Sequence, residues 1–233
     1  MPDICTVEQT WQNSLMQTIF INGGTGYIGK RLISILLGKN YRVIALVRPG
    51  SEGKVPAGCE VVVGNPFDAA TFESKIPAGC TFVQLLGVPH PSPRKREQFY
   101  AIDLKSVQTS AAAAKQAGVG HFIYVSVSQT PTRIMRDYQQ VRAIGEAAIR
   151  ATGIPHTFLR PWYVLGPGHW WPVLLWPVYK VLEIIPSTRA KALDLGLVRL
   201  PQMLQALAWA VENPPIEEQV LNVPDIRLGS LRH

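Results

Sequence analysis

The chain has 233 residues, which suits one large domain or one domain with a small addition. With 47% hydrophobic and 17% charged residues, it has the composition of a packed globular protein and not of a disordered chain. The formal net charge of +7 favours anionic ligands, and three widely spaced cysteines suggest neither a metal site nor a disulfide framework, so we expect a reducing cytoplasm.

Residues 1–17 lack the basic and apolar blocks of a signal peptide, so we interpret them as an N-terminal arm. Beyond them, short apolar runs alternate with segments of helical periodicity. The patterns predict strands at 18–21, 41–47, 60–63, 81–86, 122–127 and 156–159, and helices at 30–39, 69–75, 97–117 and 138–151.

This alternation predicts βαβ units and an α/β fold of the Rossmann type, with a doubly wound parallel sheet formed by residues 18–160. The alternation ends after Arg160, although a helix at 201–211 is still predicted and a final apolar stretch lies at 220–223. We interpret residues 161–233 as a small appendage that completes the same domain beside the carboxyl edge of the sheet.

A glycine-rich loop separates the first predicted strand from the first predicted helix, with the spacing G-x-x-G-x-x-G. Such a loop turns tightly and lets the backbone approach a pyrophosphate, whose charge is stabilised by the helix amino terminus. The sequence therefore predicts a dinucleotide site made of Gly23, Gly24, Thr25, Gly26, Tyr27, Ile28 and Gly29.

The ends of the next strands add further candidate cofactor contacts. Folds that prefer NAD carry an acid at the end of the second strand, whereas this chain has Arg48 there, followed by Ser51. An arginine suits a 2′-phosphate, so NADP is predicted as the cofactor, with NAD as the weaker alternative. Asn65 and Gly87 follow the third and fourth strands, and Asp68 either contacts the adenine or caps the next helix.

The segments GGTGYIG, Arg48, YVSVS, Tyr138 and LRPWYVLGPG, in this order, resemble the short-chain dehydrogenase/reductase superfamily. The resemblance covers about residues 18–223 and is greatest to the atypical NAD(P)H-binding branch, which is NmrA-like or epimerase-like. It implies that Tyr138 exchanges a proton with the substrate and that Ser126 or Ser128 orients the substrate oxygen.

Two positions depart from the pattern of that superfamily. Arg142 stands four residues after Tyr138, where active members have a lysine. An arginine keeps the charge that would hold the nicotinamide ribose and lower the phenol pKa, but it does not readily lose a proton. Asp103 replaces an expected asparagine. It either hydrogen-bonds a neighbouring helix or water or, as we favour, is a partly exposed helical acid.

The segment from Pro161 to Tyr179 contains no charged residue. By the resemblance, Pro161, Trp162 and Tyr163 lie beside the nicotinamide. Trp162, His169 and Trp170 are candidate substrate contacts, and their large aromatic surfaces favour a small apolar substrate. Alternatively, the tryptophans form the core of the appendage and His169 is structural. The composition is also compatible with interfacial membrane contact through 161–186.

The sequence favours an NADP(H)-dependent oxidoreductase that reduces a small apolar or aromatic carbonyl or enone. A non-catalytic NADP(H)-binding redox sensor or assembly protein is the alternative. A sugar epimerase or dehydratase ranks last, because 161–233 is short for a lobe that binds a nucleotide sugar. No nucleic-acid partner is expected, because the one dense basic run, 93–97, is interpreted as a solvated loop.

Overall fold

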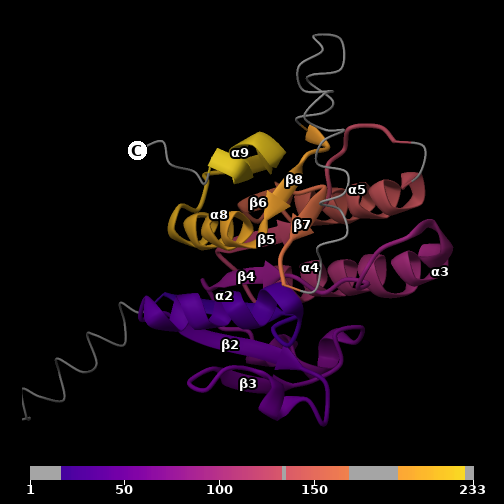
Figure 1. Cartoon of the computed structure of the whole chain (residues 1–233). Helices are drawn as coiled ribbons and strands as arrows, with labels where there is room; N and C mark the ends of the chain where they lie inside the picture. Colours follow the sequence, from indigo (N-terminus) through magenta and orange to yellow (C-terminus); the bar gives the residue numbers. More distant parts are fainter. Residues whose placement is uncertain (1–16, 133–134, 168–193, 229–233) are drawn as a thin grey trace, which may run out of the picture.

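The computed structural model describes residues 17–132, 135–167 and 194–228. Its centre is a seven-stranded sheet in the order β3-β2-β1-β4-β5-β6-β9, in which every neighbouring pair is parallel (Figure 1). The strands are β1 (Thr18–Asn22), β2 (Arg42–Val47), β3 (Glu60–Val63), β4 (Thr81–Gln84), β5 (His121–Val125), β6 (His156–Arg160) and β9 (Glu218–Asn222).

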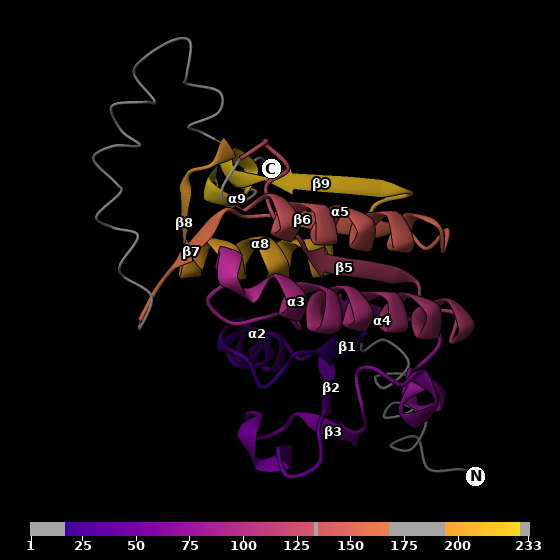
Figure 2. The same ribbon diagram turned by 90° about the vertical axis from the view of Figure 1, so that its right-hand side faces the viewer.

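Helices cover both faces of this sheet, which confirms the predicted doubly wound α/β fold (Figure 2). The strand order reverses between β1 and β4, and ligands of such sheets bind in the crevice outside the carboxyl ends at this point. The helices are α2 (Tyr27–Gly38), α3 (Arg96–Gln98), α4 (Lys105–Gln116), α5 (Arg136–Arg150), α8 (Leu200–Glu212) and α9 (Val223–Leu228).

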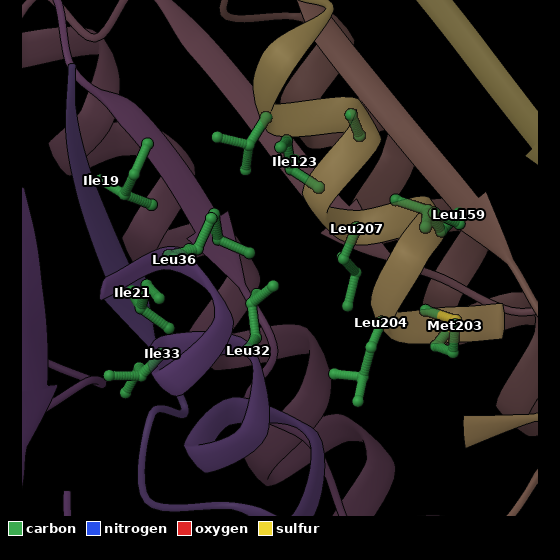
Figure 3. Packing of buried hydrophobic residues seen from close by; sticks show 14 of the residues in the cluster. Ile19, Ile21, Leu32, Ile33, Leu36, Ile123, Leu159, Met203, Leu204 and Leu207 are labelled. Carbon is green, nitrogen blue, oxygen red and sulfur yellow. The ribbon is translucent and has the colours of Figure 1, made fainter. Parts of the chain in front are cut away.

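One face of the sheet is aliphatic, because every second side chain of the central strands is isoleucine, valine or leucine. The helices α2 and α8 pack on this face through leucines, isoleucines and a methionine (Figure 3). The labelled members of this core are Ile19, Ile21, Leu32, Ile33, Leu36, Ile123, Leu159, Met203, Leu204 and Leu207.

The opposite face is aromatic. Phe20, Phe82 and Phe122 occupy neighbouring strands. The ring centroids of Phe20 and Phe82 lie 5.3 Å apart, and those of Phe82 and Phe122 lie 5.0 Å apart. The helix that covers them, α4, presents small side chains such as Ala111 and Ala114. Small residues on the helix leave room for the ring layer, so the alanine run of α4 and the phenylalanines of the sheet complement each other.

Two predicted helices differ from those observed. The segment 69–75 contains two short 3₁₀ turns, η2 (Ala69–Thr71) and η3 (Glu73–Lys75), because Phe72 leaves helical geometry between them. The segment 97–117 begins with α3 and a π-helix, η5 (Phe99–Leu104), before α4. The basic run 93–97 is largely exposed as expected, but it forms the turn η4 (Pro93–Lys95) and the start of α3.

The described residues after 160 lie in two places, whereas the sequence predicts one appendage at the carboxyl edge. Helix α8 and strand β9 belong to the main layers, because β9 pairs with β6 along its length. The remaining part is a two-stranded parallel ribbon, formed by β7 (Tyr163–Leu165) and β8 (Leu197–Arg199), together with α9.

Among the described residues, no helix is long and apolar enough to cross a membrane. The same part of the chain contains no group of histidine, cysteine or acidic side chains that could hold a metal ion. Only 161–167 of the segment predicted to contact a membrane surface belongs to the described residues.

Candidate functional site

The glycine loop between β1 and α2 leaves no room for side chains at two of its glycines. Gly23 has φ +91°, and a Cβ there would lie 2.6 Å from the backbone nitrogen of Leu86. A Cβ at Gly29 would overlap the carbonyl oxygen of Gly23. Close packing of the helix on the loop therefore depends on both glycines.

The amino end of α2 has the properties of an anion site. Gly26, which precedes the helix, is exposed and extended, and it provides no side-chain cap. The first turn contains no acidic residue, so its N–H groups can bind a phosphate without a competing negative charge. This open backbone fits the pyrophosphate of a dinucleotide.

Arg48 is exposed immediately after β2. No ion pair to Arg48 occurs within the described ranges. Ser51 is half-buried in the turn that follows, and the Lys54 Nζ lies 3.5 Å from its hydroxyl. Lys54 adds a second cation to the turn, and its position three residues after Ser51 is the sequence signal that could have identified it.

The side chains of Asn65 and Asp68 accept hydrogen bonds from backbone groups two residues further along the chain. The Asn65 Oδ1 accepts a hydrogen bond from the Phe67 backbone at 3.1 Å. The Asp68 Oδ1 accepts one from the Ala70 backbone at 3.2 Å and caps η2. Of the two roles considered for Asp68, capping is therefore the one formed in this structure.

Arg142 lies inside the protein and is bonded to protein groups. It is 6% exposed, and its Nη2 forms an ion pair with Asp103 of η5. Its Nη1 donates hydrogen bonds to the Tyr124 Oη at 3.2 Å and to the Val125 carbonyl at 2.9 Å. A nicotinamide ribose would have to compete with these partners for the guanidinium.

Asp103 is 1% exposed, so its interpretation as a partly exposed helical acid is wrong. Its second carboxylate oxygen accepts a hydrogen bond from the Val88 backbone at 3.1 Å. Burial raises the pKa of Asp103, whereas the Arg142 charge and the Val88 hydrogen bond lower it. Gly87 lies against this pair, because a Cβ there would overlap the Arg142 Nη2. We call Asp103 and Arg142 the buried clasp.

Tyr138 packs against the buried clasp. The Arg142 Cζ lies 5.1 Å from the centre of the Tyr138 ring, and the ring of Phe99 lies 4.8 Å away. Burial raises the pKa of Tyr138 above its ordinary value, and the charge of Arg142 offsets this effect only in part. Arg142 therefore acts on the phenol pKa in the expected direction, but the effect of burial is larger.

The two candidate serines follow β5 and differ in what their hydroxyls do. The Ser126 Oγ is buried and has no hydrogen-bond partner among the described residues. The Ser128 Oγ accepts a hydrogen bond from the Thr130 backbone at 3.4 Å. Gln139, which the sequence reasoning missed, fixes this loop by donating to the Ser128 and Thr130 carbonyls at 2.7 Å each.

Side chains that follow the carboxyl ends of three neighbouring strands meet around Tyr138. Val88 follows β4, Met135 precedes α5 after β5, and the half-buried Trp162 follows β6. Pro161 is buried and accepts a hydrogen bond from the Ser128 backbone at 3.0 Å. Tyr163 lies edge-on to Trp162 at 5.7 Å between ring centroids. The candidates His169 and Trp170 lie outside the described residues.

A hollow of about 870 Å³ opens beside the loop before α5. Helical periodicity places Arg136 and Gln140, which line it, on the side of α5 opposite Tyr138 and Arg142. The hollow is therefore separate from the cluster around Tyr138. Its lining residues are Gln129, Pro131, Thr132, Arg136, Gln139 and Gln140.

A family model described as NAD(P)H-binding matches residues 23–166, from the first glycine of the loop to the residue after β7. The match covers more than half of the chain. The chain belongs to the NAD(P)H-binding family. The predicted relation to the atypical short-chain dehydrogenases/reductases and the predicted binding of a nicotinamide dinucleotide are thereby confirmed.

This NAD(P)H-binding protein is similar to a ceramide reductase of Caulobacter vibrioides, with 27% identity over 152 residues. The alignment covers 64% of this chain and 47% of that reductase, so the chain spans about half the length of this relative.

Solved structures share the fold of this NAD(P)H-binding protein at low identity. A UDP-galactose 4-epimerase has a TM-score of 0.68 and 19% identity, covering 89% of this chain and 77% of the other. MoeE5 in complex with UDP-glucuronic acid and NAD has a TM-score of 0.65 and 18% identity, covering 88% and 76%.

Proposed function

We propose that the protein is an NADP(H)-dependent oxidoreductase that reduces the carbonyl or enone of a small apolar or aromatic substrate. The observation that carries this proposal is the position of Tyr138, whose phenol lies in the cluster at the carboxyl ends of β4, β5 and β6. The glycine loop, the family match and the 27% identical relative named as a reductase support the same class of reaction.

When it is bound, a reduced nicotinamide supplies a hydride to the carbonyl carbon. Tyr138 donates its phenolic proton to the carbonyl oxygen, so that the C=O bond becomes CH–OH. Ser126, whose hydroxyl has no partner among the described residues, hydrogen-bonds that oxygen. Water returns the proton to Tyr138, because an arginine at position 142 does not readily give one up.

The preference for NADP over NAD is supported by the two cations near the turn after β2. Arg48 is exposed there without an ion pair in the described ranges, and Lys54 lies beside Ser51. A 2′-phosphate suits such a turn better than a ribose 2′-hydroxyl does. NAD is the weaker alternative, and it is the cofactor in the MoeE5 complex.

A thermal-shift series with NADP⁺, NADPH, NAD⁺ and NADH tests the cofactor, because ligands that bind only the folded state stabilise it. We expect a larger shift with NADP⁺ than with NAD⁺ at equal concentration. Arg48→Gln should raise the Kd of NADP⁺ at least about tenfold and leave that of NAD⁺ unchanged. Arg94→Gln, another exposed arginine, is the matched control. A larger shift with NAD⁺ would contradict the role of Arg48.

The substrate class is supported by the aromatic pair Trp162 and Tyr163, and by the lipid substrate in the name of the ceramide reductase. With an apolar carbonyl that is turned over, Tyr138→Phe should lower kcat at least about 100-fold, because general acid catalysis is lost. Tyr100→Phe, in the same cluster, is the control. Undiminished turnover by Tyr138→Phe would contradict the role of Tyr138 as proton donor.

A non-catalytic NADP(H)-binding sensor or assembly protein is the second candidate. It is favoured by the clasp, because Arg142, which stands where active members have a lysine, is already paired with Asp103. Tight cofactor binding without hydride transfer would support it, and multiple turnovers would contradict it. A sugar epimerase or dehydratase is the third candidate. Interfacial membrane contact through 161–186 and a cytoplasmic location stay predictions.

A further inference from the structure

The buried clasp brings opposite charges together next to a candidate proton donor. Arg142 is 6% exposed and Asp103 is 1% exposed, and the two side chains are in direct contact. A guanidinium is always protonated in proteins, and a neutral Asp103 would leave it as a lone buried charge. The carboxylate is therefore ionised at neutral pH, and the clasp as a whole carries no net charge.

The ring of Tyr138 packs against the clasp and against the ring of Phe99. The Arg142 Cζ is 5.1 Å from the centre of the Tyr138 ring, and the Phe99 ring centroid is 4.8 Å from it. A lone cation at this distance would favour the phenolate strongly, because opposite charges within about 4–6 Å stabilise the ionised form. The carboxylate of Asp103 opposes that stabilisation, because its negative charge raises the pKa of the phenol.

The other charged and titratable groups around Tyr138 add no net positive charge beside its ring. Tyr124 of β5 is a neutral phenol whose pKa burial raises to about 12. Tyr100 of η5 lies in the same cluster. At the start of α5, Asp137 pairs with Arg96 at 3.2 Å, so this exposed pair adds no net charge.

We propose that Asp103 is a positioning residue: it cancels the charge of Arg142 beside Tyr138, so that Tyr138 remains a proton donor and the site is built for reduction of a carbonyl. The preference for reduction rests on the proposed function of Tyr138. The electrostatic part concerns only the protein and can be measured without a substrate.

Tyr138 can be titrated by NMR of protein labelled with ¹³C at the tyrosine Cζ, with Tyr138→Phe to assign its signal. In the wild type we expect ionisation only above pH 10, in line with the raised pKa of this phenol. In Asp103→Asn the acid dissociation constant of the phenol should rise at least about tenfold. An unchanged constant in a folded Asp103→Asn would overturn the proposal, as would a wild-type phenol that ionises below pH 8.

Asp103→Asn leaves Arg142 unpaired and buried, so it can fail to fold. The double variant Asp103→Asn/Arg142→Gln removes both charges and keeps polar groups at both positions. Because the clasp is neutral, we expect the phenol of the double variant to titrate within about threefold of the wild type. If the wild-type clasp instead acted as a cation, its removal would lower the constant at least about tenfold, and the proposal would be wrong.

Tyr124→Phe is the control, because it removes one hydrogen bond of Arg142 and no charge. The outcomes separate this inference from the proposed function. The expected titrations without any turnover would support the clasp and contradict the reductase. If turnover depends on Tyr138 but the acid dissociation constant of its phenol is unchanged in Asp103→Asn, the reductase is supported and the proposed role of the clasp is contradicted.

Discussion

Gly87 lies against two atoms that are held in place by other bonds. A Cβ there would overlap the Arg142 Nη2 and lie 2.9 Å from the Asp103 Oδ1. Neither atom can move without breaking the buried ion pair between them. The sequence predicts Gly87 as a cofactor contact, whereas in the structure the clasp itself requires a glycine at this position.

Gly87→Ala should therefore lower the free energy of unfolding by about 1–3 kcal/mol, as overpacking of a buried site does. Gly38→Ala is the matched control, because a Cβ at the last residue of α2 meets nothing within 4 Å. Alanine favours helix over glycine, so the control should be neutral or slightly stabilised. Urea unfolding at pH 7 measures both, and a Gly87→Ala protein as stable as the wild type would show that the clasp can shift.

At the scale of elements, the strands were the most predictable part of the fold. The apolar run of β3 has the predicted bounds, and β1, β2 and β6 differ from prediction by one residue at one end. Each run is short, apolar and followed by glycine, proline or polar residues, so both its type and its limits are encoded locally. The glycine loop was predictable for the same reason.

The clasp shows what a local pattern leaves out. Asp103 has the helical spacing of Ser106, Val107 and Ser110, all of which are buried, so its burial could have been read from the sequence. Its partner could not, because Arg142 lies 39 residues away on another helix. The π-helix that carries Asp103 also has no signal in hydrophobic periodicity.

The elements after Arg160 were predicted least well. The strands β7 and β8 contain three residues each, too few for a period to appear. The apolar stretch at 220–223, which overlaps the end of β9, is assigned by the sequence to the appendage and not to the main sheet. Its position depends on pairing with β6 and on burial of Leu221 in the aliphatic core, both of which are tertiary interactions.

At the scale of the whole molecule, one buried histidine at the centre of the sheet makes the free energy of unfolding depend on pH in the acidic range. His121 of β5 is 2% exposed, and its Nε2 is 2.9 Å from the Thr157 Oγ1 of β6. Burial, assisted by the charge of His156, lowers the pKa of His121 from 6.5 to about 4. Protonation of His121 therefore favours the unfolded chain, and the stability associated with the neutral ring is lost as the pH falls from 6.5 towards 4.

His121→Gln keeps a polar group for Thr157 but does not titrate. Between pH 7 and pH 5, the free energy of unfolding should fall by about 2 kcal/mol more in the wild type than in His121→Gln. Glu218 does not interfere, because Arg150 and His156 lower its pKa from 4.5 to about 2 and its effect begins only at more acidic pH. Urea unfolding at both pH values tests this difference. Equal losses in the two proteins would mean that His121 is protonated in the folded sheet, with its charge accommodated between β5 and β6.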